Sequence, residues 1–303
     1  MKLAARKRNL LLRARMVQSI RAFFIEQGYL EIDTPQLISA PAPEVHIEAL
    51  RAGGRYLQTS PELCMKRLLA SGFPKIFQIG KCFRAGERGD RHLPEFSLLE
   101  WYRTGIDYKA LMNECEALIC FVSQRLDMGG KILYRANKID LKKPWQRISV
   151  SAAFDQYAFI SLERALEEGC FDQVMVEEIE PNLGTISPTF LYDYPASMAA
   201  LARLKPGNMA LAERFEIYIA GLELANGFSE LNDPVEQRAR FVRDLQIRDA
   251  AGKEACPMPE RFLRSLEHMP DAAGIALGVD RLAMFFSGAQ KIDEVVPFTP
   301  EEV

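Results

Sequence analysis

The sequence predicts an α+β fold in which an antiparallel β-sheet is flanked by helices. Two apolar strand candidates, residues 75–83 and 95–103, are joined by a polar, glycine-containing segment, as in an antiparallel hairpin. Amphipathic helical patterns occupy residues 4–27 and 108–126 on either side of this hairpin. Strands and helices follow one another without the regular alternation that is typical of a parallel sheet.

The composition is that of a globular protein. The chain has 303 residues, of which 48% are hydrophobic and 26% charged, and its formal net charge is −3. These values exclude a disordered or fibrous chain. The sequence has no apolar run near the roughly 18 residues of a membrane span and no signal-peptide pattern, so we expect a cytoplasmic protein without membrane contact. The acidic balance weakly disfavours tRNA as a partner.

Sequence patterns predict the other elements in order. Gly28 ends the first helix, an extended segment follows, and Ser60 before a proline indicates a helix at residues 62–70. The acid-rich stretch at residues 141–186 is interpreted as a mostly helical insertion. The remaining predicted elements are strands at 214–224 and 228–231 around a turn at 225–227, a helix at 234–249, a strand at 274–279 and a helix at 280–286.

The hairpin segment holds a candidate phosphate and purine site. It contains Arg84, Glu87, His92 and Phe96. A solvated loop would explain the charges but not their arrangement. A guanidinium that leaves a strand at Arg84 can bind a phosphate in a forked geometry, and Phe96 on the opposite strand offers a flat face to a purine ring.

Two carboxylates, Glu216 and Glu223, are seven residues apart on one predicted strand. Strand alternation places them on opposite faces unless a bulge or twist near Gly221 intervenes. Two solvent-facing carboxylates therefore remain the alternative. If both face one cavity, they suit magnesium, which prefers oxygen ligands and shares them with substrate phosphates.

A candidate ammonium receptor follows on the next strand. Asn226, Phe228 and Glu230 alternate there and bring an amide, an apolar wall and a carboxylate to one face. Near the C-terminus, Gly278 permits close backbone approach and Arg281 can reach a phosphate. A helix cap with a surface charge is the simpler interpretation of an Asp-Arg pair taken alone.

Together these segments resemble the three signature motifs of class II aminoacyl-tRNA synthetases. Residues 7–36 with GYLEIDTP resemble motif 1, residues 75–103 with FRAGERGDRHLPEF motif 2, and residues 274–287 with GIALGVDRLAMF motif 3. SPELCMKRLL, LLEWY and ELANGFSELND are similar to lysyl-tRNA synthetases in particular. The resemblance implies one class II catalytic domain over residues 1–303 and a homodimer formed through motif 1.

The resemblance also implies a role for each candidate residue. Arg84 would hold the α-phosphate of ATP, Phe96 and Arg281 would enclose the adenine, and both arginines would act in catalysis. Glu87, His92 and Gly278 would also contact ATP, although Glu87 stands one residue later than the carboxylate of the family's usual Arg-x-Glu. Glu216 and Glu223 would bind Mg²⁺. The lysine pocket would consist of Ser60, Glu62, Glu100, Tyr102, Asn226, Phe228, Glu230 and Ala276.

The motif 1 helix starts within ten residues of Met1, so we expect no anticodon-binding OB-fold domain before it. This shorter form resembles the elongation factor P lysine lysyltransferase family. That family activates lysine, preferentially (R)-β-lysine, as an adenylate and transfers it to a lysine of elongation factor P. Ala276 stands where lysyl-tRNA synthetases usually have glycine, and Ser60 where they commonly have alanine, which fits the narrower family.

Two other functions stay open at this stage. A truncated lysyl-tRNA synthetase would charge tRNA or a tRNA-like acceptor through the acceptor stem alone. A non-catalytic protein of this fold would bind lysine or a nucleotide as a sensor. The choice between α-lysine and β-lysine and the surface that meets the acceptor also stay open.

Overall fold

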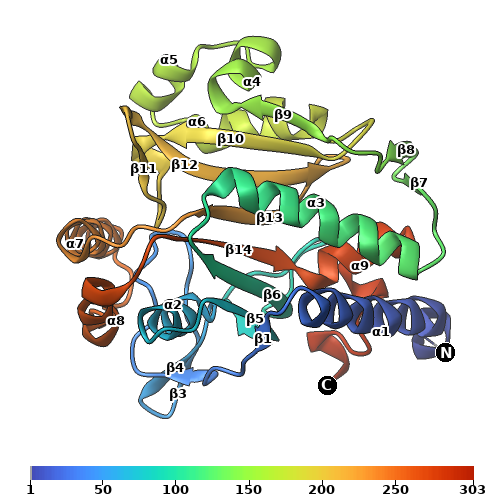
Figure 1. Cartoon of the computed structure of the whole chain (residues 1–303), viewed down its shortest axis with the longest axis horizontal. Helices are drawn as coiled ribbons and strands as arrows, with labels where there is room; N and C mark the ends of the chain where they lie inside the picture. Colours follow the sequence, from blue (N-terminus) through green and yellow to red (C-terminus); the bar gives the residue numbers. More distant parts are fainter. Residues whose placement is uncertain (1) are drawn as a thin grey trace.

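A nine-stranded β-sheet forms the centre of residues 2–303, the part of the chain that the computed structural model describes (Figure 1). In spatial order its strands are β1 (Leu30–Glu31), β5 (Lys75–Phe83), β6 (Glu95–Thr104), β14 (Ala272–Gly278), β13 (Leu222–Ser229), β12 (Asn208–Ile219), β10 (Thr189–Pro195) and β9 (Gln146–Ser149), and β11 (Leu204–Lys205) pairs with β12. Only the edge pairs, β1 with β5 and β9 with β10, are parallel within these residues. The predicted α+β fold is confirmed.

Helices surround this sheet (Figure 1). On one face lie α1 (Lys2–Glu26), α3 (Tyr108–Arg125) and α9 (Val279–Ser287). Helix α2 (Glu62–Ala70) lies across β6 and contacts α8 (Glu260–Ser265), which in turn contacts α7 (Pro234–Ala250). Near β9 and β10 lie α4 (Val150–Tyr157), α5 (Leu162–Glu167) and α6 (Phe171–Val174). Separate small sheets consist of β2 (Leu37–Ile38), β4 (Arg55–Leu57) and β3 (Arg51–Ala52), and of β7 (Lys131–Tyr134) and β8 (Asn137–Asp140). Over residues 2–303, no helix has the combination of length and apolar character that crossing a membrane requires.

Helix α1 supplies much of the core beneath the sheet. Its side chains Met16, Ile20 and Phe24 are spaced four residues apart and have no exposed surface. Phe24 stacks on Phe77 of β5 with the ring centroids 4.7 Å apart. Complete burial of such a side chain contributes on the order of 2 kcal/mol to folding. The helix ends before Gly28, whose φ of 73° is readily available only to glycine.

The predicted turn at residues 225–227 is wrong. The chain turns instead at Ala220 and Gly221, both at positive φ, and residues 225–227 lie inside β13. A Cβ atom on Gly227 would come within 2.7 Å of the Phe215 ring and 2.9 Å of Ile275. Asn-Gly is a strong local turn signal, but here the glycine is present because the neighbouring side chains leave no room.

The stretch at residues 141–186 contains a strand as well as helices. It opens with β9, which extends the main sheet in parallel with β10, and continues through α4, α5 and α6. A separate apolar cluster that includes Phe154, Phe171 and Tyr218 joins these helices to the sheet. Strand β9 was not predicted, because four residues are too few to show a strand period. Part of the predicted insertion therefore belongs to the sheet itself.

Candidate active site

Four of the candidate residues form a row across the sheet. Glu100 of β6 is paired with Ala276 of β14, Ala276 with Asn226 of β13, and Asn226 with Glu216 of β12. Residues directly opposite one another in antiparallel strands point to the same face. The flanking residues in these strands face the other way, into the core that α1, α3 and α9 cover: Leu99, Trp101, Phe215, Ile217, Ala225, Ile275 and Leu277. Strand alternation thus separates the candidate site from the core.

A second row lies on the same face, two residues away along each strand. It contains Tyr102, Gly274, Phe228 and Arg214, paired in this order from β6 to β12. A Cβ atom on Gly274 would collide with the ring of Tyr102 and with Oε1 of Glu230. Only glycine allows these two side chains to approach the sheet so closely.

Glu62, Glu100 and Glu230, which we call the acidic receptor, gather above these rows. Glu100 is fully buried and accepts hydrogen bonds from Ser60 Oγ at 2.6 Å and from the Tyr102 hydroxyl at 2.7 Å. Ser60 Oγ also accepts from the backbone N–H of Glu62 at the start of α2, which ties the helix to Glu100. Sequence motifs far apart in the chain therefore meet at one point.

A buried lysine, which the sequence analysis did not single out, lies inside the acidic receptor. Lys66 Nζ is 2.5 Å from Oε1 of Glu62 and 2.5 Å from Oε2 of Glu230. Both oxygens of Glu230 are buried without a hydrogen-bond partner in the part of the chain that the structure describes, so the contact of Oε2 with Lys66 is an ion pair. The available signal was the spacing of four between Glu62 and Lys66 on a predicted helix. The receptor thus contains three carboxylates and one internal cation.

Burial dominates the electrostatics of the acidic receptor. It raises the pKa of Glu100 to about 8, with a further increase from Glu62 and opposing hydrogen bonds from Ser60 and Tyr102. It also raises the pKa of Glu230 to about 8, although the Lys66 ammonium opposes the shift. For Lys66, burial acts to lower the pKa, but Glu230 and Glu62 outweigh it and raise the pKa above the ordinary lysine value. Another cation would relieve this excess of negative charge.

Arg84 and Phe96 lie at the other end of the site. The guanidinium of Arg84 lies over the Phe96 ring, 5.1 Å from its centroid, and Glu87 Oε1 is 3.7 Å from Arg84 Nη1. The Nε of Arg84 is buried and has no hydrogen-bond partner among residues 2–303. An unpaired guanidinium N–H of this kind suits an anionic oxygen. The structure therefore places Glu87 beside Arg84 in spite of its shifted sequence position.

His92, Arg281 and Glu223 form a connected group between the two ends. Arg281 Nη2 is 2.5 Å from His92 Nε2, and Arg281 Nη1 is 3.1 Å from Glu223 Oε2. Burial lowers the pKa of His92, and the neighbouring Arg281 lowers it further, which favours the neutral imidazole. At Gly278, an added Cβ atom would meet only the Arg281 side chain, at an ordinary contact distance of 3.6 Å. The neighbouring atoms of the described chain therefore leave room for a larger residue at this position.

Glu216 and Glu223 do face the same side, because of a bulge. Tyr218 pairs with Glu223 and Ile217 with Ala225, which leaves Leu224 as the extra residue in β13. Glu216 is 2.5 Å from Arg214 Nη2 and accepts a hydrogen bond from the Tyr218 hydroxyl at 2.6 Å. Burial raises the pKa of Glu216, Arg214 opposes this, and Glu223 raises it further. The bulge, rather than a twist at Gly221, brings the two carboxylates together.

The donor set of this pair fits a hard divalent cation. In residues 2–303, no group of three or more histidine, cysteine, aspartate or glutamate side chains could hold a metal ion. Two carboxylates without a third protein ligand suit Mg²⁺, which usually completes its shell with water and substrate phosphate oxygens. Glu180 was not among the predicted site residues. Its carboxylate lies 3.2 Å from the Tyr218 hydroxyl, which donates to Glu216 at the shorter distance, and its pKa is raised by burial and then by Glu216 and Glu223.

Comparison with known proteins agrees with this geometry. The family model for class II tRNA synthetases (D, K and N) matches residues 2–302. The chain belongs to this family. It is therefore an ATP-dependent ligase of the class II synthetase type, and the sheet described above is the catalytic sheet of that class.

Named relatives show two groups within this family. An elongation factor P--(R)-beta-lysine ligase of Proteus mirabilis is 40% identical over 96% of this chain and 94% of the relative, and one of Vibrio cholerae is 38% identical over 94% and 93%. A lysine--tRNA ligase of Thermoanaerobacter pseudethanolicus is 38% identical over 96% of this chain but 64% of the relative. The expected resemblance to the class II lysyl family is confirmed.

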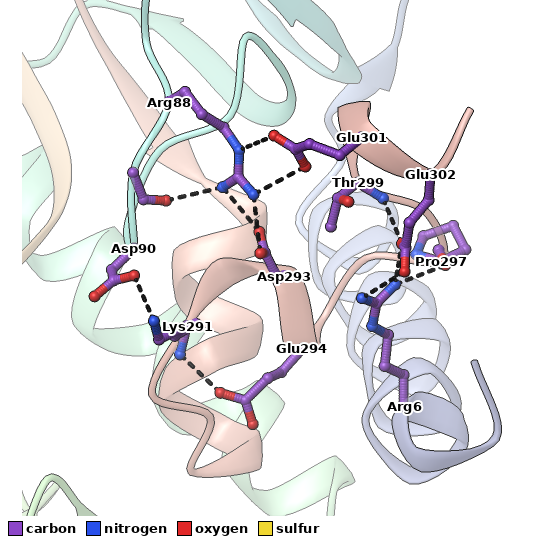
Figure 2. Close-up of polar contacts among 11 residues, drawn as sticks. Arg6, Arg88, Asp90, Lys291, Asp293, Glu294, Pro297, Thr299, Glu301 and Glu302 are labelled. Carbon is purple, nitrogen blue, oxygen red and sulfur yellow. Dashed lines mark hydrogen bonds and ion pairs between the residues drawn. The ribbon is translucent and has the colours of Figure 1, made fainter. Parts of the chain in front are cut away.

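The C-terminal segment of this class II ligase holds the loop between β5 and β6. Figure 2 shows Arg88, at the tip of this loop, bonded to Asp293 and Glu301. The Arg88 guanidinium lies 2.9 Å from Asp293 and 2.8 Å from Glu301. Hydrogen bonding to Arg88 lowers the pKa of Glu301 to about 2, so this carboxylate stays charged down to acidic pH. The tether restrains the loop that carries Glu87 and His92.

Another segment that the sequence analysis missed lies close to the site. Arg248 of α7 donates to the carbonyls of Glu44 and Ile47 and binds the Glu48 carboxylate, so the loop before β3 is anchored to α7. Burial raises the pKa of Glu44 to about 7, opposed by Arg84 and assisted by Glu62. The Glu44 carboxylate therefore lies within electrostatic reach of both ends of the site. Its position depends on a loop with no periodic pattern, which sequence analysis cannot place.

Proposed function

We propose that this class II ligase activates lysine, preferentially (R)-β-lysine, as an adenylate and transfers it to a lysine side chain of elongation factor P. The observation that supports lysine as the substrate is the charge of the acidic receptor. Glu62, Glu100 and Glu230 surround one internal ammonium, that of Lys66, so two negative charges are unbalanced once Glu100 and Glu230 are ionised. A dicationic amino acid would balance them. The names of the Proteus and Vibrio relatives support elongation factor P as the acceptor and β-lysine as the substrate.

In the proposed complex, each end of the site binds one part of the reactants. Arg84 would bind the α-phosphate through its unpaired Nε, and Phe96 and Arg281 would enclose the adenine. Glu87, His92 and Gly278 would contact the remainder of the nucleotide. The substrate's amino groups would lie against Ser60, Glu62, Glu100, Tyr102, Asn226, Phe228, Glu230 and Ala276. A wrong substrate with an apolar side chain would leave buried charge unpaired, which is costly.

The proposed chemistry needs no protein nucleophile. The substrate carboxylate attacks the α-phosphorus in line, the bond to the β-phosphate breaks, and pyrophosphate leaves. The acceptor amine then attacks the activated carbonyl, loses a proton, and AMP leaves. Arg84 and Arg281 would hold the phosphates and stabilise the negative charge that develops on them. Mg²⁺ held by Glu216 and Glu223 would supply additional charge stabilisation on the phosphate oxygens.

A homodimer is part of this proposal. Exposed apolar side chains on α1 and on the strand that follows it offer a surface for a two-fold contact. They include Leu11, Ile25 and Leu30, which are 59%, 62% and 49% exposed. A two-fold contact through motif 1 would cover these side chains. Light scattering is expected to give twice the 34.3 kDa chain mass, and a monomer at micromolar concentration would contradict it.

Pyrophosphate exchange tests the proposed function. Lysine-dependent ATP–pyrophosphate exchange is measured with α-lysine and with (R)-β-lysine, and the labelled product is then offered to elongation factor P and to lysine tRNA. The expected result is a preference for β-lysine and label on the protein. Preference for α-lysine with label on tRNA would make the enzyme a tRNA-charging synthetase. Absence of exchange with either amino acid would leave a lysine or nucleotide sensor.

The affinity for lysine is expected to fall as pH decreases below about 8. Glu100 and Glu230 both have a pKa raised to about 8, so below that pH they hold protons, whereas a bound ammonium requires the carboxylate form. Each proton displaced on binding weakens the affinity by up to about tenfold per pH unit. Calorimetry between pH 6 and pH 9, in buffers of different ionisation enthalpy, measures both affinity and proton release. A constant affinity without proton release would contradict the assignment of these two carboxyls to the substrate.

A further inference from the structure

Lys66 is a fully enclosed charge inside the acidic receptor. Its side chain has no exposed surface, its ammonium is within 2.5 Å of Glu62 and Glu230, and it lies 5.1 Å from the centroid of the Phe228 ring. Phe262 of α8 lies on a further side, 6.0 Å from the ammonium. A core position of this kind would ordinarily hold an apolar side chain, because a buried ammonium is stable only when it is paired. The presence of lysine here therefore calls for a reason beyond packing.

The geometry around Glu230 supplies that reason. Lys66 Nζ forms an ion pair with Oε2 at 2.5 Å, although neither oxygen of Glu230 has a hydrogen-bond partner in the described chain. Oε1 lies buried beside Tyr102, in the space that the missing side chain of Gly274 leaves free. One oxygen of Glu230 is thus fixed by the protein, and the other is available at the floor of the site. A carboxylate held in this way loses little rotamer freedom when it receives a ligand.

Charge leads to the same conclusion. Without Lys66, the three carboxylates of the acidic receptor would face one another across a buried space with no cation from the described chain between them. Carboxylates so close together cannot all ionise, and some would take up protons and cease to attract an ammonium group. Lys66 opposes the protonation of Glu230 and Glu100, so that, once both are ionised, two negative charges remain for the substrate.

We propose that Lys66 is a positioning residue for substrate recognition: it holds Glu230 in the receiving orientation and favours the ionised form of the acidic receptor, which a dicationic amino acid requires. The inference rests on the proposed function, since it assumes that the receptor binds the amino groups of lysine. Lys66 itself stays paired with Glu62 and Glu230 and does not contact the reacting atoms.

The groups that face this ammonium and its partners define the expected titration. They are Glu62 on α2, Glu100 and Tyr102 on β6, Glu230 after β13, Cys82 on β5 near Glu100, and Glu44 on the loop near Glu62. Lys66 is the cation that contacts Glu62 and Glu230, whereas Arg84 acts on Glu44 and Cys82 at the edge of this set. Removal of Lys66 is expected to move the pH at which the receptor loses substrate affinity upward, because Glu230 loses the charge that opposes its protonation.

The test compares Lys66→Met with Arg67→Met in the full-length enzyme. Arg67 is the next residue of α2, is exposed, and loses the same charge when replaced. For Lys66→Met we expect the KM for lysine at pH 7.5 to rise by about tenfold or more, with the KM for ATP unchanged, and the low-pH limb of lysine affinity to move upward by about one pH unit. Arg67→Met is expected to behave as the unchanged enzyme.

Other outcomes separate the inference from the proposed function. If Lys66→Met raises both KM values, or lowers activity without moving the pH limb, Lys66 has a packing role only and the inference is overturned. If Lys66→Met does not fold, Lys66→Gln carries the same test, because glutamine can hydrogen-bond one carboxylate but brings no charge. If the unchanged enzyme itself shows no lysine-dependent exchange, the proposed function fails, whatever the variants show.

Discussion

Replacing Arg84 with alanine is expected to reduce lysine-dependent ATP–pyrophosphate exchange by about 10³-fold while the melting temperature stays unchanged. The Arg84 guanidinium lies over Phe96, and its buried Nε has no hydrogen-bond partner in the described chain. Removal of the guanidinium therefore takes away a donor to the phosphate, and the Nε atom has no internal hydrogen bond to lose. Loss of one such preorganised donor to a developing charge typically costs about 10²–10³ in rate, and Arg84 also carries a full positive charge.

Lys81→Ala is the control for Arg84. Lys81 lies three residues before Arg84, on β5, and its side chain is 45% exposed. Its ammonium forms an ion pair with Glu95 at a distance of 3.2 Å, and this pair lies outside the candidate site. Exchange activity of this variant is expected to match that of the unchanged enzyme. Retention of exchange in Arg84→Ala would remove Arg84 from the proposed mechanism, because no other guanidinium over Phe96 could replace it.

The second large effect is expected for Glu230→Gln, which should lower kcat/KM for lysine by about 100-fold or more. Glutamine keeps the size of the side chain but removes the charge that would pair with the substrate ammonium. Leaving one partner of a buried ion pair uncompensated costs about 3 kcal/mol or more, which corresponds to about 100-fold at room temperature. Lys66 keeps Glu62 as a partner in this variant, so the fold is expected to persist.

The kinetics of two glutamate variants distinguish recognition from stability. Glu213→Gln makes the same chemical change at another buried glutamate of the sheet, one that pairs with Arg203 at 2.8 Å outside the acidic receptor. It is expected to leave the KM for lysine unchanged. An equal loss of kcat/KM in both variants would mean that Glu230 acts through stability of the sheet and does not receive the substrate.

Local pattern was sufficient where an element is long and amphipathic. The strand over residues 75–83 was predicted with the bounds that the structure shows, and the helices over residues 62–70 and 108–126 agree with it to within one residue. In these segments the helical or strand period repeats several times, and the burial of one face rewards the same conformation that the local propensities favour. The motif strings could therefore be placed on elements from the sequence alone.

Local pattern failed where a neighbour decides the conformation. Asn226 and Gly227 suggest a turn, but the rings and branched side chains beside Gly227 require a bare backbone within a strand. The shared orientation of Glu216 and Glu223 depends on one extra residue in β13, which shifts the register of every residue that follows. Neither effect has a signal within a short window of sequence.

The sequence by itself determined the fold class, the family and the set of side chains that bear the chemistry, because these depend on periodicity and on short strings of residues that lie next to one another in the chain. Only the tertiary structure decided how these side chains meet. The row from Glu100 to Glu216 exists because four strands pair in one register, and the internal ammonium of Lys66 becomes part of the acidic receptor because α2 is packed against β6. The charge, burial and pKa values of that receptor depend on residues that are far apart in the chain, since Glu62 and Glu230 are separated by 168 positions. No local pattern encodes these properties.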